Sequence, residues 1–135
     1  MKYLVDTSAL IRIHRHQADP VWREVARRGL IMLCEPVLAE AMHVADDRRH
    51  AETEAEFHDT YIVTTVPDRV WNVMGGIRHE LVGNGVFRGV SLVDQLVAAT
   101  AIILRLEVLH EDHDFETVAR YVPELRQRRL SAGVA

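Results

Sequence analysis

Short apolar segments alternate with longer helical stretches along this chain, and that alternation limits the folds it can adopt. Each apolar segment has the length of a strand and is followed by residues with helical character. The segments are Lys2–Val5, Leu30–Cys34, Tyr61–Val66 and Glu107–His110. Strands that alternate with helices form a parallel sheet covered on both faces. The sequence therefore predicts the α/β class.

The predicted helices fill the stretches between these strands. They run over Thr7–His16, from Asp19-Pro20 to Gly29, and over Glu35–Ala45, Arg49–Thr60, Pro67–Ile77, Ser91–Leu104 and Phe115–Tyr121. Ser91–Leu104 is apolar on nearly every side, which is typical of a buried central helix. Trp22 and Trp71 fall on apolar helix faces, so we expect both in the core.

Composition bounds the class of protein. The 135 residues fit one domain, and we expect residues 1–135 to form a single unit. Lys and Arg number 16 against 20 Asp and Glu, a net charge of −4 with an isoelectric point near 6.0. This balance excludes proteins that bind nucleic acid through bulk positive charge. Cys34 is the only cysteine, which excludes an internal disulfide and a cysteine-type zinc site.

No segment indicates a membrane protein. The longest mostly apolar run, Leu96–Leu104, is far shorter than the ~20 residues of a membrane span. Asp6 interrupts the stretch where a signal peptide would need apolar residues. We therefore expect a cytoplasmic protein with no membrane partner.

Acidic residues stand where the predicted strands end. Asp6 follows the first strand, and Asp112 and Asp114 follow the fourth. In a parallel sheet, ligands bind beyond the carboxyl ends of the strands, so these acids would face one crevice. Asp94 opens the buried central helix. Glu40 lies beside the apolar stripe of its own helix, where an ionised carboxylate needs a partner.

Each acid, taken alone, also has an ordinary structural interpretation. Asp6 fits a turn at a strand end, and Asp94 fits a helix-capping arrangement. Glu40 fits an ion pair with a nearby arginine. Asp112 and Asp114 fit a loop, in which Asp114 caps the helix that follows. Only their combination, in which separate segments each deliver an acid to one edge or buried face, indicates a shared site.

Such a cluster predicts metal chemistry. Carboxylates in one place repel each other, which raises their pKa values unless a cation stabilises the charged forms. Oxygen ligands suit Mg²⁺ or Mn²⁺ rather than zinc. The ion would supply positive charge for a phosphodiester substrate and activate a water for its hydrolysis.

At these positions the chain resembles the PIN-domain nucleases, in particular the VapC toxins of bacterial toxin–antitoxin pairs. The matching segments are Leu4–Ser8, Glu40, Ser91–Asp94 and Asp112–Phe115, and they span nearly the whole chain in the same order. The resemblance implies a three-layer α/β/α sandwich with a mainly parallel central sheet. It also implies an Mg²⁺- or Mn²⁺-dependent endoribonuclease that a small VapB-type antitoxin neutralises.

The resemblance gives each acid a role. Asp6 and Asp94 would be the principal metal ligands, and Asp112 would complete the set directly or through water. Glu40 would position or deprotonate the attacking water. Asp114 would be an additional acid of the catalytic site.

Other residues near the motifs have supporting roles in this interpretation. A hydroxyl of Thr7 or Ser8 would hold the site through hydrogen bonds. His110, Glu111 and His113 differ from the commoner polar residues around the last motif, which leaves open whether a histidine joins the metal ligands.

Arginines are the candidate contacts to RNA phosphates. They are Arg12, Arg15, Arg48, Arg49 and Arg88. For any one of them, solvated surface charge is the favoured interpretation, and the same holds for the arginines near the chain end, which are Arg126, Arg128 and Arg129. The resemblance implies a structured RNA substrate, such as transfer or ribosomal RNA.

The resemblance further implies a homodimer, to which the apolar segment around Val82, Val86 and Phe87 would contribute. Two other functions stay open. A PIN-like module would bind RNA or assemble without cleaving it, although the complete set of acids argues against that. A phosphatase or receiver-type domain also gathers acids at strand ends, but a receiver needs a lysine near its end, and Lys2 is the only lysine.

Overall fold

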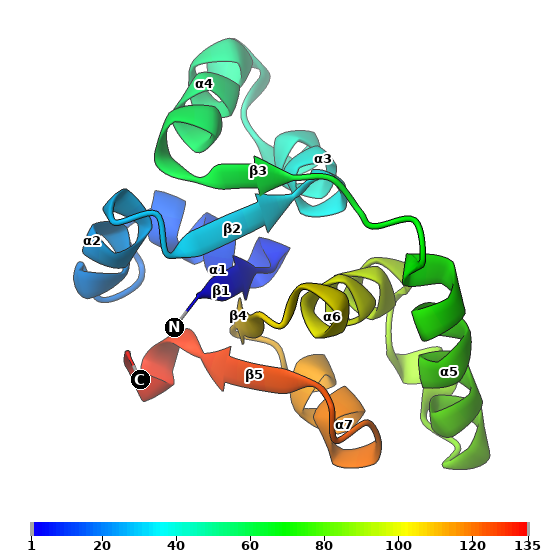
Figure 1. Cartoon of the computed structure of the whole chain (residues 1–135). Coiled ribbons are helices and arrows are strands. Elements are labelled where there is room, and N and C mark those ends of the chain that lie inside the picture. Colours follow the sequence, from blue (N-terminus) through cyan, green and yellow to red (C-terminus); the bar gives the residue numbers. More distant parts are fainter. Residues whose placement is uncertain (1, 135) are drawn as a thin grey trace.

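A five-stranded sheet runs through the centre of the molecule, as the computed structural model shows for residues 2–134 (Figure 1). The strands are β1 (Tyr3–Val5), β2 (Ile31–Cys34), β3 (Ile62–Thr64), β4 (Glu107–His110) and β5 (Arg126–Arg129). They lie in the order β3-β2-β1-β4-β5, and every neighbouring pair is parallel. The predicted α/β class is confirmed.

Helices cover both faces of this sheet. They are α1 (Thr7–His14), α2 (Val21–Arg27), α3 (Glu35–Val44), α4 (His50–Thr60), α5 (Val70–Gly83), α6 (Leu92–Leu104) and α7 (His113–Tyr121). Short 3₁₀ turns are η1 (Asp47–Arg49), η2 (Phe87–Gly89) and η3 (Leu130–Ala132). Helix α1 packs against α3, whereas α5, α6 and α7 pack against one another. Because parallel crossovers are right-handed, the two groups lie on opposite faces, which gives the three predicted layers.

The central strands β1 and β4 are buried along their whole length. Their neighbour in the core is α6, whose small residues Ala98, Ala99 and Ala101 are fully buried. Small side chains let the helix approach the sheet closely, so the start of α6 lies near the ends of β1 and β4. Within the described residues, no helix is long and apolar enough to cross a membrane.

The structure confirms one of the two tryptophans predicted in the core and contradicts the other. Trp22 is fully buried, and its indole N–H donates to the carbonyl of Leu130 at 3.2 Å, as expected of a core tryptophan. Trp71 is 65% exposed, so its assignment to the core is wrong. Val70, Met74, Ile77 and Leu81 form the buried stripe of α5, and Trp71 lies about 100° around the helix from Val70.

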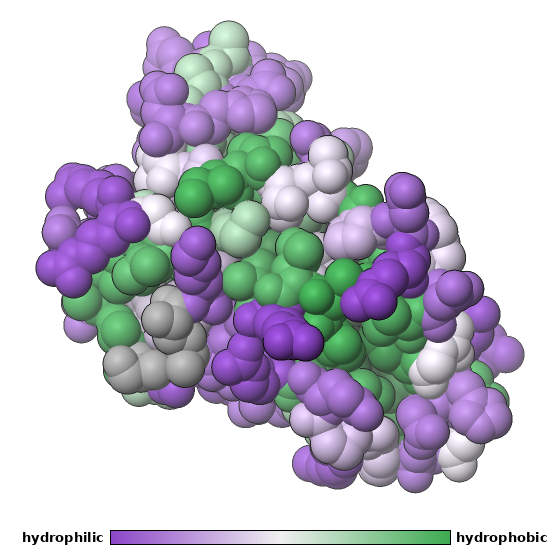
Figure 2. Space-filling model, viewed as in Figure 1, coloured by the Kyte–Doolittle hydropathy of each residue, from purple (hydrophilic) through white to green (hydrophobic). Residues whose placement is uncertain are grey.

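The arginine-rich end is a strand, which the sequence did not indicate. Strand β5 pairs with β4 over its full length, so Arg126, Arg128 and Arg129 are sheet residues instead of loose surface charge. Helix α4 is mostly polar, and Thr53 and Phe57 are its buried residues. Figure 2 shows mainly hydrophilic residues over this helix.

Candidate metal centre

Three aspartates from distant parts of the sequence meet where β1 and β4 end. Asp6 directly follows β1, Asp112 lies just beyond β4, and Asp94 is in the first turn of α6. One carboxylate oxygen from each lies within 4.8 Å of the others. Strands β1 and β4 are parallel neighbours, so their carboxyl ends share one edge of the sheet. The structure thus brings together the three predicted metal ligands.

Helix starts position these acids. Asp6 is the N-cap of α1 and accepts the backbone N–H of Ala9 at 2.9 Å. Asp112 is the N-cap of α7 and accepts the N–H of Asp114 at 2.9 Å, so Asp112 takes the capping role that the sequence gave to Asp114. Asp94 is the third residue of α6, and its backbone N–H donates to the hydroxyl of Ser91, the N-cap, at 3.1 Å. Helix N-termini carry partial positive charge, which stabilises carboxylates placed there.

Asp6 is the most buried of the three, with 2% of its surface exposed. The pKa of Asp6 is raised to about 6: burial is the main cause, the charge of Asp112 adds to it, and hydrogen bonds from Ala9 and Ser8 act in the opposite direction.

Asp94 has the largest shift at this site. Burial raises the pKa of Asp94 to about 7, followed by repulsion from Asp112, Asp6 and Asp114. A carboxyl group with this pKa is only partly ionised at neutral pH, and a bound cation would favour its charged form.

Asp114 borders the cluster and has His113 beside it. Burial and the charge of Asp112 raise the pKa of Asp114, and the neighbouring His113 lowers it. The Nε2 atom of His113 lies 3.3 Å from Asp114, and its Nδ1 atom lies 3.9 Å from Asp112. These three residues form a second group whose ligand atoms lie within 4.8 Å of one another. His113 therefore lies at the border of the site, and its side chain is exposed.

Ser8 connects the two strands that carry the site. Its hydroxyl oxygen lies 2.8 and 2.9 Å from the carboxylate oxygens of Asp6, to which it donates. The same oxygen accepts the backbone N–H of Glu111 at 3.0 Å. Of the two hydroxyls predicted to support the site, that of Ser8 makes these hydrogen bonds. The hydroxyl of Thr7 is buried and has no hydrogen-bond partner among the described residues.

The cluster has the chemistry of a cation site. Among residues 2–134, no arginine or lysine forms an ion pair with Asp6, Asp94 or Asp112. Neighbouring carboxylates with raised pKa values and only oxygen donors fit Mg²⁺ or Mn²⁺. The acidic cluster is therefore consistent with a metal site, and the identity of the ion stays a prediction.

Glu40 lies outside this cluster. It is half-buried on α3 and belongs to neither group of close ligand atoms. Its predicted role with the attacking water stays a prediction.

The arginines predicted to contact RNA lie in different surroundings. Arg12 is partly buried and donates to the carbonyl of Ser8 at 3.0 Å, which places it one turn from the site. Arg15 and Arg88 are exposed. Arg48 is exposed, and Arg49 pairs with Glu52 on the surface.

The end of β4 and the turn that follows it make contacts with β5 that the sequence analysis did not predict. His110 is fully buried, with Nε2 at 2.6 Å from Oε1 of Gln127 and Nδ1 accepting the N–H of Asp112 at 3.0 Å. Burial lowers the pKa of His110. Arg129 donates to Glu111 at 3.1 Å and to Glu116 at 2.6 Å. These contacts depend on β5, and no local sequence signal marks that strand.

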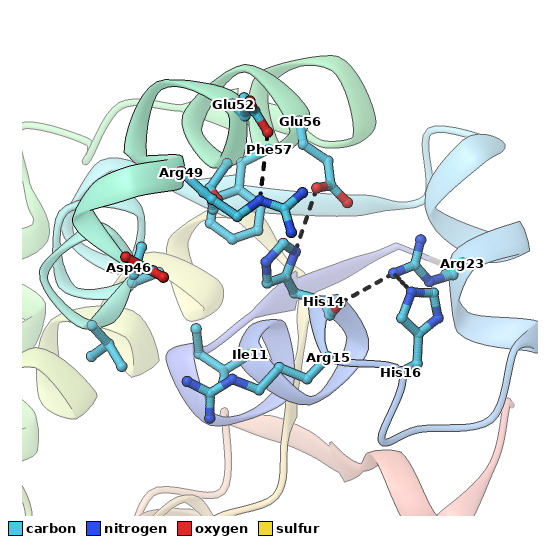
Figure 3. A pocket seen from close by; sticks show the side chains of 14 residues that line it. Ile11, His14, Arg15, His16, Arg23, Asp46, Arg49, Glu52, Glu56 and Phe57 are labelled. Atoms are coloured by element: carbon cyan, nitrogen blue, oxygen red, sulfur yellow. Dashed lines mark hydrogen bonds and ion pairs between the residues drawn. The ribbon is translucent and has the colours of Figure 1, made fainter.

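A separate groove of about 470 Å³ lies between α1, α3, η1 and α4 (Figure 3). Ile11, Ala41 and Phe57 supply apolar lining, while charged side chains surround it. In Figure 3 the ring of His14 lies below Glu56, with Nδ1 at 3.6 Å from its carboxylate. Ala41 and Glu40 are adjacent on α3, so the helix that carries this acid also lines the groove.

Comparisons with known proteins agree with this geometry. The model of the PIN domain family matches residues 3–121. Ribonuclease VapC6 of Mycobacterium tuberculosis is 35% identical over 98 residues, which cover 72% of this chain and 77% of that protein. Ribonuclease VapC21 of the same organism is 32% identical over 123 residues, which cover 87% and 86%.

The fold agrees as well. The crystal structure of DNA-bound VapBC from Salmonella typhimurium superposes with a TM-score of 0.79 at 18% identity and covers 96% of this chain and 98% of that chain. The family indicated by the sequence motifs is therefore confirmed: the chain belongs to the PIN-domain family, among the VapC ribonucleases.

Proposed function

We propose that this protein, as one PIN domain over residues 1–135, is a metal-dependent endoribonuclease and the toxin of a VapBC-type pair. The observation that carries the proposal is the cluster of Asp6, Asp94 and Asp112, which lacks an internal arginine or lysine partner among the described residues. Relatives named ribonucleases support RNA as the substrate. A module that binds RNA without cleaving it has no need for such a cluster.

In this proposal the aspartates bind the cation and a neighbouring hydroxyl orients one of them. Asp6, Asp94 and Asp112 would hold Mg²⁺ or Mn²⁺, and Ser8 keeps the Asp6 carboxylate oriented through its hydroxyl. When bound, such an ion polarises a phosphodiester oxygen and acidifies a water. Asp94, with a pKa of about 7, releases its proton when it becomes a ligand.

We assign the remaining acids by position. Asp114 borders the cluster and contributes negative charge to it, as its effect on the pKa of Asp94 indicates. Glu40 keeps the role with the attacking water that the family resemblance gives it.

A cleavage assay tests the proposal. Purified protein is incubated with transfer RNA in Mg²⁺, Mn²⁺ or EDTA, together with the Asp6→Asn variant. We expect cleavage by the wild type only with metal, and none by Asp6→Asn. Asp59→Asn, which changes an exposed acid on α4, is the matched control and should cleave like the wild type. Undiminished metal-dependent cleavage by folded Asp6→Asn would refute the proposal, and RNA binding without cleavage in any metal would favour the module.

We further propose that a VapB-type antitoxin docks in the groove between α1, α3 and α4. The structural neighbours include toxin–antitoxin complexes, which supports a partner of this kind. An apolar lining with a charged rim suits an amphipathic segment, and Val44 beside it is 52% exposed. Val44→Asp should weaken antitoxin binding and leave RNA cleavage intact. Equal antitoxin affinity for Val44→Asp and wild type would exclude this groove.

The remaining partner predictions belong to the same proposal. A homodimer is supported by exposed apolar surface on α5, where Val82 is 57% exposed, while Val86 and Phe87 are only partly buried. RNA and antitoxin are cytoplasmic partners, which supports that location. Expression of the toxin should arrest growth, and co-expression of the antitoxin should relieve the arrest.

A further inference from the structure

His110 is a buried titratable side chain that the proposed metal chemistry does not use. It is the last residue of β4 and is completely shielded from solvent. The aromatic ring of Phe115 on α7 packs against it, with 5.2 Å between ring centroids. Buried polar atoms need hydrogen-bond partners, and both ring nitrogens of His110 have one.

The hydrogen bonds determine where the proton of this ring lies. The backbone N–H of Asp112 can only donate, so Nδ1 of His110, 3.0 Å away, must be the acceptor. In a neutral imidazole the proton is then on Nε2, which donates to Oε1 of Gln127 at 2.6 Å. Gln127 lies on β5, and its carbonyl oxygen therefore selects the tautomer that can hold Asp112.

This contact matters because of what Asp112 does. Its carboxylate belongs to the acidic cluster, and one carboxylate oxygen is already fixed by the N–H of Asp114. With the backbone N–H bound to His110, the residue is held at two points. The preceding amide, that of Glu111, is held in turn by Ser8. Partners that orient a metal ligand contribute to affinity without touching the ion.

We propose that His110 is a positioning residue for Asp112, with its tautomer fixed by Gln127. The inference rests on the proposed metal site and adds to it a connection between that site and the edge strand β5.

Two substitutions at His110 separate positioning from packing. In His110→Asn the side-chain oxygen lies near the position of Nδ1 and can still accept from Asp112. In His110→Gln the amide reaches toward Gln127, and the acceptor beside Asp112 is lost. We expect His110→Gln to weaken Mn²⁺ binding about ten-fold, which is the usual effect of removing a residue that hydrogen-bonds a metal ligand. His110→Asn should weaken Mn²⁺ binding less. Arg126→Gln is the control, because Arg126 lies on β5 but donates to Arg105 on the opposite side of the strand from Gln127.

The measurements are Mn²⁺ titration calorimetry on folded protein and long-range ¹H–¹⁵N NMR of the histidine rings. The wild-type spectrum should show His110 with the proton on Nε2. Equal Mn²⁺ affinities for folded His110→Asn and His110→Gln, or a proton on Nδ1 in the wild type, would overturn the inference.

A third variant covers the case in which both His110 variants fail to fold. Gln127→Leu, at a half-buried position, removes only the acceptor for Nε2. It should weaken Mn²⁺ binding and mix the two tautomers in the NMR spectrum, and an unchanged affinity and spectrum would overturn the inference. A wild-type protein that binds no Mn²⁺ would instead refute the metal site itself, while the NMR spectrum would still report the tautomer.

Discussion

Charged residues gather in two neighbouring regions of this molecule, and they are arranged in opposite ways. At the ends of β1 and β4, Asp6 and Asp94 face Asp112, and no arginine or lysine of residues 2–134 is paired with them. One strand away, Arg129 of β5 is held between Glu111 and Glu116, at 3.1 and 2.6 Å. The first region is short of positive charge, whereas in the second, called the balanced region below, each of these two acids has an arginine partner.

The pKa values follow this difference. The pKa of Asp6 is raised to about 6 and that of Asp94 to about 7, chiefly by burial. The pKa of Glu116 is lowered by its hydrogen bond to Arg129. Burial acts to raise the pKa of Glu111, but hydrogen bonds from Ser131 and Arg129 lower it overall. Acids paired within the chain stabilise the fold, and acids left without a partner are available to an external cation.

The comparison is tested most severely by Asp94→Asn. This change removes a proposed metal ligand and should reduce metal-dependent RNA cleavage at least about 100-fold. Loss of a residue that only hydrogen-bonds a metal ligand already lowers metal affinity or activity about 10–100-fold. The metal-free variant should unfold at a higher temperature than the wild type at mildly alkaline pH, since repulsion with Asp6 and Asp112 is relieved. Cleavage rates and thermal unfolding check both outcomes. A variant that loses stability and keeps activity would show that Asp94 serves the fold.

pH provides the second test. In the metal-free protein the folded state holds protons on Asp6 and Asp94 that the unfolded state has released, so stability should fall as pH rises through about 6 and 7. Mn²⁺ affinity should rise over the same range, roughly ten-fold or more, as the ion displaces those protons. Thermal unfolding with and without Mn²⁺ across this range measures both trends. A pH-independent Mn²⁺ affinity would mean that these two acids are not ligands.

Ser8→Ala tests how the acidic region is held. The variant loses the hydroxyl that donates to Asp6 and accepts from Glu111, and Mn²⁺ affinity should fall about ten-fold, as for other outer partners of a ligand. Thr64→Ala is the control, since it removes a hydroxyl at the end of β3 that contacts only a neighbouring carbonyl. An equal affinity in both variants would leave Ser8 with no role at the site.

Arg129→Gln addresses the balanced region and should affect metal binding least. Loss of the pairs with Glu111 and Glu116 should lower the unfolding temperature near neutral pH, while Mn²⁺ affinity changes less than in Ser8→Ala. Both glutamates have lowered pKa values, so this contribution is present above their ordinary value of 4.5 and is lost as pH falls through the lowered values. The difference in unfolding temperature between variant and wild type should therefore vanish in acid. A difference that persists there would indicate lost packing instead of lost charge pairing.

The sequence predicts the acidic region well, for a physical reason. Buried parallel strands are short continuous apolar runs, and an acid directly after such a run must lie at the edge of the sheet. Asp6 and Asp112 could be placed in this way, and Asp94 followed from the apolar helix that it opens. The contact of Ser8 with Glu111, across 103 positions, had no local signal.

The balanced region could not be predicted in the same way. Strand β5 consists of Arg-Gln-Arg-Arg, which lacks the apolar pattern of a strand. It forms because it adds to the edge of β4 and because Arg128 and Arg129 find acids on β4, the following turn and α7. Those partners are far away in sequence, so each arginine looked like ordinary surface charge. The exposed Trp71 is a second case, since the apolar face of α5 is narrower than its composition indicates.

The position of β4 beside β1 has a consequence for the synthesis of this protein. During synthesis, the first strand leaves the ribosome long before the fourth, and the bond between Ser8 and Glu111 awaits residues 103 positions further on. A nascent chain without β4 has neither Asp112 nor the strand that closes the sheet next to Asp6. The acidic cluster can therefore assemble only when translation of the chain is almost finished.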